Sequence, residues 1–241
     1  AAGIRYDRSI FLPGRPSSAY VCLLDADGSL VGAVAAMELF DVLTIEMMET
    51  CWQAGDEARL VILDGNLPRP VLEAALARWS GKPVLLDPVS EAKAGRAKGL
   101  LGDLMMIKPN LREAELLAGI ASTDRAEDPV VRAKRAANAL VDQGVKEAFV
   151  SIGLHGLVYA DSSLCGFVSP LDLPVVNVSG AGDAAVAGIA TATLCGYDIA
   201  VKAAMAMALA SYCAASTMTV ADGMTSGSLF AAAGRVRNER L

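Results

Sequence analysis

Short apolar runs alternate with helical patterns along most of the chain, and this alternation constrains the fold more than any other feature of the sequence. It is typical of a sheet buried on both faces by helices. It therefore predicts a three-layer α/β fold with a mostly parallel central sheet, whose ligands bind beyond the carboxyl ends of the strands. The expected strands cover residues 59–63, 84–86, 104–107, 148–152 and 175–178, and the expected helices cover 45–55, 70–80, 111–118, 129–143, two alanine-rich segments separated by Gly196, and 228–237.

One segment near the N-terminus breaks this alternation. Residues 18–24 and 30–35 have the pattern of two strands, and the turn-rich segment 25–28 joins them at hairpin length. We expect this hairpin, about residues 18–35, to form a small β lid over the functional site. A second hairpin is expected over residues 157–168. The length of 241 residues predicts a single domain over residues 1–241.

The charge balance and the cysteine usage restrict the partners. With 21 Lys and Arg against 27 Asp and Glu, the formal charge of −6 repels nucleic acid and anionic membranes and favours small molecules. One histidine and five cysteines without close spacing disfavour zinc sites and disulfides, and predict a cytoplasmic protein with reduced thiols. The apolar stretch 201–220 contains Lys202 and Ser211, which favours a buried helix over a membrane span.

The most informative motif is Gly180-Ala181-Gly182-Asp183, which follows an expected strand and precedes a helical pattern. Two glycines around a small alanine allow a tight turn with exposed N–H groups, and the helix N-terminus adds partial positive charge. The turn can therefore hold a phosphate or a developing anion, and Asp183 can take a proton from an attacking hydroxyl. The alternative is an ordinary tight turn with an acid in the first helical turn. No P-loop motif occurs.

Two further motifs follow expected strands. In KPNLRE, residues 108–113, Asn110 and Glu113 have the spacing of a capping box, and Glu113 could instead organise Mg²⁺ through water near phosphate groups. In SIGLHG, residues 151–156, a loop that starts at Ser151 and contains Gly153 and Gly156 could pass close to a nucleotide. An ordinary β-hairpin turn explains this loop as well.

Together the three motifs resemble the ribokinase-like, or PfkB-type, family of small-molecule kinases, which carry KPNxxE, SxGxxG and GAGD in this order. The resemblance extends from the first residues to near residue 220 and implies ATP-dependent phosphorylation of a hydroxyl group. It implies that Asp183 is the base, that the amides of Gly180, Ala181, Gly182 and Asp183 form an anion hole, and that the hairpin is the family's lid. It further implies that Asn110 and Glu113 organise phosphate and Mg²⁺, and that residues 151–156 bind nucleotide. A homodimer through the lid is a further expectation.

Softer cues concern the acceptor. The segments 17–28, 31–38, 64–67 and 87–94 resemble those family members that phosphorylate pseudouridine, so pseudouridine is the preferred acceptor, and adenosine-, ribose- and fructose-type kinases stay open. By its position in this resemblance Asn66 would contact the sugar or nucleoside, and a turn residue after a strand explains it equally well. Lys93 is interpreted as a solvated helix residue. A non-catalytic nucleotide- or metabolite-binding protein is the alternative from another functional class.

Two departures from the family pattern matter. Members of the family open with a βαβ segment that supplies substrate-binding residues, and no such segment precedes Ala1. We therefore expect a fragment, or a chain from which residues were dropped, because a protein starting at Ala1 would lack one strand and half of its substrate pocket. Asn177 stands where many relatives have an aspartate that helps to hold a monovalent cation, which leaves activation by K⁺ open.

Overall fold

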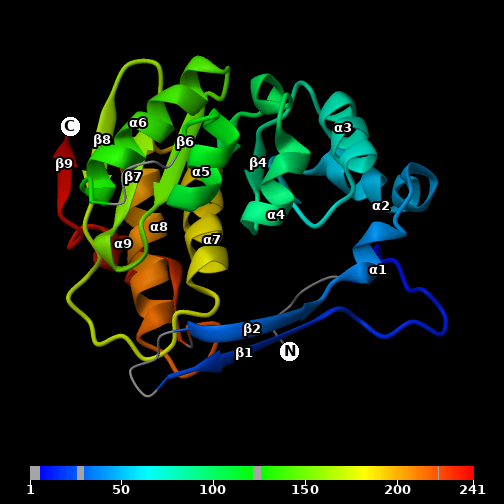
Figure 1. The fold of residues 1–241 in the computed structure, drawn as a ribbon, viewed down its shortest axis with the longest axis horizontal. Coiled ribbons are helices and arrows are strands. Elements are labelled where there is room, and N and C mark those ends of the chain that lie inside the picture. The colour runs from blue at the N-terminus through cyan, green and yellow to red at the C-terminus, as the bar shows by residue number, and fades with distance from the viewer. Residues whose placement is uncertain (1–5, 26–29, 122–125, 222) are drawn as a thin grey trace.

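The computed structural model of the protein describes residues 6–25, 30–121, 126–221 and 223–241. Figure 1 shows a central sheet with helices α5 and α6 on one face and helices α7 and α8 on the other, and a separate hairpin that extends below them in this view. The predicted three-layer α/β fold with a small β lid is confirmed. The elements lie close to their predicted places along most of the chain.

The bounds of the elements are as follows. The strands are β1 (Ala19–Leu24), β2 (Leu30–Ala36), β3 (Val61–Asp64), β4 (Val84–Asp87), β5 (Met106–Ile107), β6 (Glu147–Ser151), β7 (Leu157–Ala160), β8 (Cys165–Val168) and β9 (Asn238–Arg240). The α-helices are α1 (Glu38–Asp41), α2 (Ile45–Glu57), α3 (Arg69–Arg78), α4 (Glu91–Ala94), α5 (Leu111–Ala118), α6 (Pro129–Asp142), α7 (Ala181–Leu194), α8 (Ile199–Ala214) and α9 (Ser226–Ala233). Short 3₁₀ turns are η1 (Gly95–Ala97), η2 (Leu101–Asp103) and η3 (Gly153–His155).

In the described residues, the central sheet has seven strands in the order β3-β4-β5-β6-β7-β8-β9. Strands β3 to β6 pair in parallel, and β7, β8 and β9 are added as antiparallel neighbours. Because β8 is antiparallel to β7, it runs in the same direction as β6, so five of the seven strands share one direction. The sheet is therefore mostly parallel, as predicted, and its parallel strands end at a common edge.

Successive side chains of the central strands enter different cores, since side chains alternate across a sheet. Leu86 and Val150 belong to the core covered by α3, α5 and α6, whereas Leu85 and Phe149 belong to the core covered by α7, α8 and α9. Burying one apolar side chain of this size stabilises the folded state by about 1.5–3 kcal/mol. The apolar stretch around residues 201–214 forms most of α8 and is largely buried. None of the helices in the described ranges is long and apolar enough to cross a membrane.

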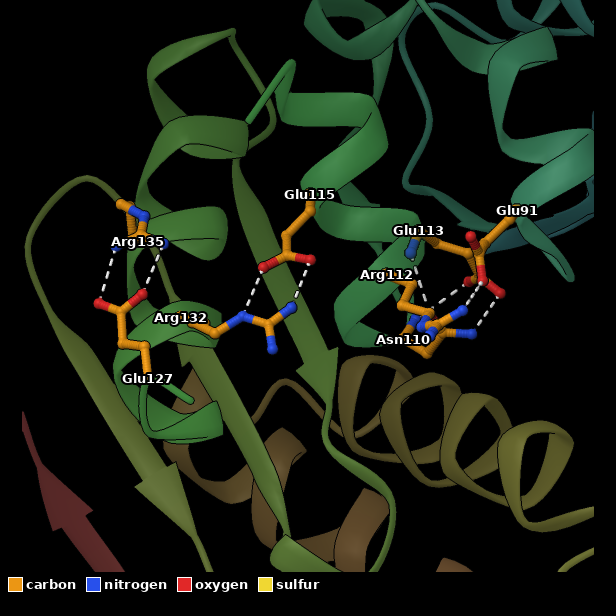
Figure 2. Close-up of polar contacts among 8 residues, drawn as sticks. All are labelled: Glu91, Asn110, Arg112, Glu113, Glu115, Glu127, Arg132 and Arg135. Atoms are coloured by element: carbon orange, nitrogen blue, oxygen red, sulfur yellow. Dashed lines mark hydrogen bonds and ion pairs between the residues drawn. The ribbon is translucent and has the colours of Figure 1, made fainter. Parts of the chain in front are cut away.

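A buried ion pair fastens α5 to α6. Figure 2 shows the guanidinium of Arg132 donating two parallel hydrogen bonds, each 2.8 Å long, to the carboxylate of Glu115. Both side chains are at most one-tenth exposed. Because removing one partner would leave a buried unpaired charge, this pair fixes the spacing of the two helices.

The lid is a two-stranded antiparallel hairpin, as predicted, and its predicted turn lies largely outside the described residues. Val21 pairs directly with Val34, and the two side chains are 66% and 73% exposed. Cys22, whose side chain points to the other face of the hairpin, lies with its Sγ 3.4 Å from Ser179 Oγ. One face of the lid thus touches the loop before α7, and the opposite face presents apolar side chains to solvent.

At the C-terminal side, one predicted element is wrong and another has different bounds. The expected strand 175–178 is a loop, in which the amides of Val176 and Asn177 both donate to the carbonyl of Ala214 at the end of α8. Its backbone is therefore used to cap a helix and not to extend the sheet. The last helix begins at Ser226 and ends at Ala233, and the chain then adds β9 to the edge of the sheet beside β8.

The position of α7 depends on a close approach to α8 at Gly188. A Cβ atom on Gly188 would lie 2.6 Å from the Cα of Ala206, which forces the helices apart. We predict that Gly188→Ala destabilises the protein by about 1–3 kcal/mol, the usual cost of overpacking. Gly227→Ala in α9 is the matched control, because nothing lies within 4 Å of its Cβ position, and it should leave stability unchanged or slightly raised. Thermal unfolding of both variants checks this, and equal melting temperatures would contradict it.

Candidate active site at the N-terminus of helix α7

Helix α7 begins with a turn that leaves its N-terminus open. Gly180 is the N-cap with φ of +86°, and no side chain caps the helix. A Cβ on Gly180 would collide with the carbonyl of Thr219, so only glycine fits there. The amide of Ala181 donates to Val178 O at 3.3 Å. The amides of Gly182 and Asp183 belong to the first turn, where N–H groups have no intrahelical acceptor, so they remain available to an anion.

A buried lysine lies beside this open turn. Lys108 follows β5 and is only 5% exposed, and its Nζ is 2.9 Å from the Oδ2 of Asp87 at the end of β4. A Cβ on Gly182 would lie 3.3 Å from the same Nζ. The ammonium group and the open N-terminus of α7 therefore contribute positive charge to one place.

Asp183 lies near Lys108, in the open first turn of α7. Partial burial raises the pKa of its carboxyl group, the negative charges of Asp87 and Asp64 raise it further, and the positive charge of Lys108 lowers it. A carboxylate with a raised pKa is a stronger base than an ordinary aspartate. The arrangement can therefore accept a proton next to a site that holds an anion.

The motif at residues 108–113 forms a complete capping box at the start of α5. The Asn110 side chain accepts from the amide of Glu113, and Glu113 accepts from the Asn110 amide at 3.0 Å and from its side-chain nitrogen (Figure 2). Burial raises the pKa of Glu113, while the Asn110 N–H and Lys108 lower it. The capping-box alternative for Asn110 and Glu113 is therefore observed. The carboxylate of Glu113 can still accept hydrogen bonds from water.

Ser151 joins the SIGLHG motif to the KPNLRE motif. Its amide donates to Pro109 O at 3.0 Å, and it forms a parallel bridge with Asn110. Ser151 and Gly153 line a cavity of about 320 Å³ together with Ala181 and Gly182 and with apolar side chains. The three motifs therefore meet, which their separation in sequence could not guarantee.

Gly156 is not among the residues that line this cavity. A Cβ there would collide with Val168 O, and its φ is +121°. The loop is also the turn between the antiparallel strands β6 and β7, so the hairpin alternative is observed.

Asn66 lies in a separate polar cluster near the base of the lid. It is 5% exposed, donates to Asp64 Oδ1 at 2.7 Å, and accepts from Lys93. Arg96 donates to the Asn66 carbonyl at 2.6 Å and to Asp41 at 2.9 Å. Lys93 is therefore a partner of Asn66, and its interpretation as a solvated residue is wrong. Asn66, Lys93, Arg96 and Asp41, but not Asp64, line a cavity of about 180 Å³ beside the end of β2.

Sequence reasoning missed Lys108 and Asp87. The available signal was a lysine directly after the apolar run LMMI, where a charged residue is out of place unless it has a partner. Asn177, the residue that departs from the family's aspartate, is already engaged within the protein. Its Oδ1 accepts a hydrogen bond from the Ser179 amide at 2.9 Å.

Comparison with known proteins identifies the family. A model described as pfkB family carbohydrate kinase matches residues 1–225. The chain belongs to this family.

The similarity extends to individual pfkB relatives. The pseudouridine kinase of Escherichia coli (strain K12) is 31% identical over 200 residues, which are 83% of this chain and 62% of that protein. A carbohydrate kinase from Agrobacterium tumefaciens has a TM-score of 0.75 at 28% identity, covering 96% of this chain and 73% of the other. A ribokinase from Thermotoga maritima has a TM-score of 0.68 at 19% identity, covering 90% of this chain and 69% of the other. The fold of this pfkB chain is thus ribokinase-like, and the chain spans less than two thirds of the curated relative.

The raised pKa of Asp183 predicts how stability depends on pH. A carboxyl group with a higher pKa in the folded state than its unfolded value near 3.8 destabilises the fold at pH values above the folded pKa, and this cost disappears below 3.8. We therefore predict that Asp183→Asn raises the melting temperature at pH 7 and that the gain vanishes as the pH falls to 3.5.

Asp161 is the control with the opposite sign. Although burial opposes it, hydrogen bonds from Ser163 and Leu164 lower the pKa of Asp161. Its contribution to stability is present above 3.8 and is lost as the pH falls through the lowered pKa, so Asp161→Asn should lower the melting temperature at pH 7. Equal responses of the two variants would contradict the assignment.

Proposed function

We propose that this protein is a cytoplasmic, ATP-dependent kinase that transfers the γ-phosphoryl group to a hydroxyl of a nucleoside or sugar, with pseudouridine as the preferred acceptor. The observation that carries the proposal is the uncapped N-terminus of α7 with Asp183 in its first turn. An anion-binding turn and a base within one helical turn match the needs of phosphoryl transfer.

In this mechanism Asp183 takes the proton from the acceptor hydroxyl as that oxygen attacks phosphorus. The amides of Gly182 and Asp183 donate to the oxygens of the transferring group, whose negative charge the dipole of α7 also stabilises. The amide of Ala181 contributes less than the motif suggested, because Val178 O already accepts from it. Catalysis is thus positioning and charge stabilisation.

The nucleotide is proposed to occupy the cavity lined by Ser151, Gly153, Ala181 and Gly182. Its mostly apolar lining suits an adenine ring, and its edge at Gly182 suits the phosphate groups. Mg²⁺ would neutralise phosphate charge, held by the phosphates and by water that Glu113 orients while its capping bonds with Asn110 persist.

The acceptor is proposed to bind between the lid and Asp183, within reach of Asn66. Two features support a nucleoside: the similarity to a pseudouridine kinase, and the lid, whose contact from Cys22 to Ser179 shows that it extends to the loop before α7. A sugar kinase of the ribose or fructose type is the alternative within the family. A non-catalytic binding protein is the alternative outside it.

An acceptor screen tests the proposal. We predict that ATP consumption is fastest with pseudouridine among pseudouridine, uridine, adenosine, ribose and fructose, and that Asp183→Asn lowers kcat by about 100-fold or more while ATP still binds, since a general base is lost. Preference for a sugar would favour the sugar-kinase alternative. ATP binding without turnover of any acceptor would favour the non-catalytic one.

The exposed face of the lid supports a homodimer. Val21 and Val34 are directly paired, both point away from the site, and an apolar pair of this exposure suits a second copy of the same face. We predict that Val34→Asp shifts the protein to a monomer in analytical ultracentrifugation. Val131→Asp on α6, where the side chain is 50% exposed, should leave the mass unchanged. A wild-type protein that is monomeric at all concentrations would contradict the dimer.

A further inference from the structure

A single guanidinium group connects the base of the lid to Asn66. The Nη1 of Arg96 donates to the backbone carbonyls of Asn66 and Leu67, at 2.6 and 3.3 Å. Its Nη2 donates to Asp41 Oδ1 at 2.9 Å. Asp41 ends α1, the short helix that follows the lid strand β2, whereas Arg96 lies in η1. Three segments that are far apart in the sequence therefore meet at one side chain.

Arg96 has hydrogen-bonding capacity that the protein does not use. A guanidinium group has five N–H donors, and the bonds to the two carbonyls and to Asp41 use three of them. Among the residues that the structure describes, the other two donors have no acceptor. The side chain of Arg96 is 27% exposed and lines the cavity of about 180 Å³ at the base of the lid. Arg96 can therefore bind a ligand in this cavity and keep its bonds to the protein.

The same cavity also contains hydrogen-bond acceptors. Asp41 and Glu38, both of α1, line it together with Arg96. The side chain of Asp41 is 59% exposed, and Arg96 uses its Oδ1. A carboxylate has about four lone-pair sites, so Asp41 can accept further hydrogen bonds. Donors and acceptors thus lie side by side in one small space.

Asn66 connects this cavity to the candidate active site. Its Nδ2 donates to Asp64 Oδ1 at 2.7 Å, and its Oδ1 accepts from Lys93. Asp64 in turn lies near Asp183, because its charge adds to the effects of burial and of Asp87 in raising the pKa of the Asp183 carboxyl group. An acceptor whose hydroxyl lies at Asp183 can therefore extend past Asn66 to the base of the lid.

The size and polarity of the cavity suit one flat polar ring. Its volume of about 180 Å³ is smaller than the roughly 300–1,000 Å³ of typical small-molecule sites, so it suits a part of a nucleoside and not the whole. A ring edge with a carbonyl next to an N–H offers an acceptor to Arg96 and a donor to Asp41. A uracil-type base has such an edge, and a free pentose or hexose has none.

We propose that this cavity binds the base of a nucleoside acceptor by its carbonyl and N–H edge, and that Arg96 and Asp41 determine specificity for nucleosides over sugars. This proposal rests on the proposed function. Because Asp41 follows the lid in the chain, a base bound between Arg96 and Asp41 also holds the lid over the acceptor. Both residues act far from the reacting atoms, so they contribute to acceptor binding and not to the chemical step.

Two single variants test the proposal by calorimetric titration. The probes are pseudouridine, its 1,3-dimethyl derivative, which keeps both carbonyls and lacks both N–H groups, and Mg·ATP. Asp41→Ala removes the acceptor for the N–H, so it should weaken pseudouridine binding about tenfold, the scale of one hydrogen bond to a charged group, and leave binding of the dimethyl derivative unchanged. Arg96→Lys keeps the charge and loses the donors to the carbonyl, so it should weaken binding of both compounds about tenfold.

The fold and the nucleotide site provide the controls. The pair of Arg96 and Asp41 is partly exposed, so its loss costs little stability, and both variants should bind Mg·ATP as tightly as wild type. The matched control variant is Arg135→Lys on α6, whose guanidinium bonds to Glu127 (Figure 2). It should match wild type with all three probes. Weaker binding of Mg·ATP in the test variants would indicate a structural role and overturn the proposal.

Turnover separates this proposal from the proposed function. The KM for pseudouridine should rise about tenfold in both test variants while kcat stays within about twofold of wild type, because the lost contacts bind substrate and transition state alike. An active wild-type kinase whose KM for pseudouridine neither variant changes would overturn the roles of Arg96 and Asp41 and leave the kinase function intact. Pseudouridine binding that depends on both residues, in a protein without turnover, would support the base site and reject the kinase function. A wild-type protein that does not bind pseudouridine would overturn the proposal.

Discussion

The in-register pairing of the parallel strands is the constraint on which the rest of the structure depends. Asp64 pairs with Asp87, and Leu86 pairs with Ile107, so Asp87 and Lys108 occupy neighbouring positions one residue further along. Parallel strands that start together also end together, and their last residues reach one edge of the sheet. The charged residues of the site gather there because they directly follow or end buried strands.

The second constraint is the placement of α7 against this edge. Gly180 allows the left-handed turn that starts the helix, and Gly188 allows the helix to pack closely on Ala206 of α8. One glycine sets where the helix begins and the other sets how deeply it lies. Together they bring the first-turn amides next to Lys108.

The electrostatics of the candidate site oppose stability. Carboxylates gather around one lysine, and burial with the neighbouring charges raises the pKa of Asp183. Such a cluster is costly in the free protein, and a bound cation would relieve it. The buried pair of Arg132 and Glu115, in contrast, makes two parallel hydrogen bonds and serves the packing of α5 on α6.

The sequence by itself determined the layered α/β class, the lid hairpin, most element positions and the three motifs, because these depend on local periodicity, glycine conformations and capping. Helix α5, for instance, has its predicted bounds, and its cap at Asn110 was readable from spacing alone. Only the tertiary structure decided that residues 175–178 form a loop, since a short apolar run pairs as a strand only where a neighbouring edge is free, and these amides donate to Ala214. It also decided that β9 joins the sheet and that Lys108 lies beside Gly182, because strand pairing and helix packing bring together residues that are far apart in the chain.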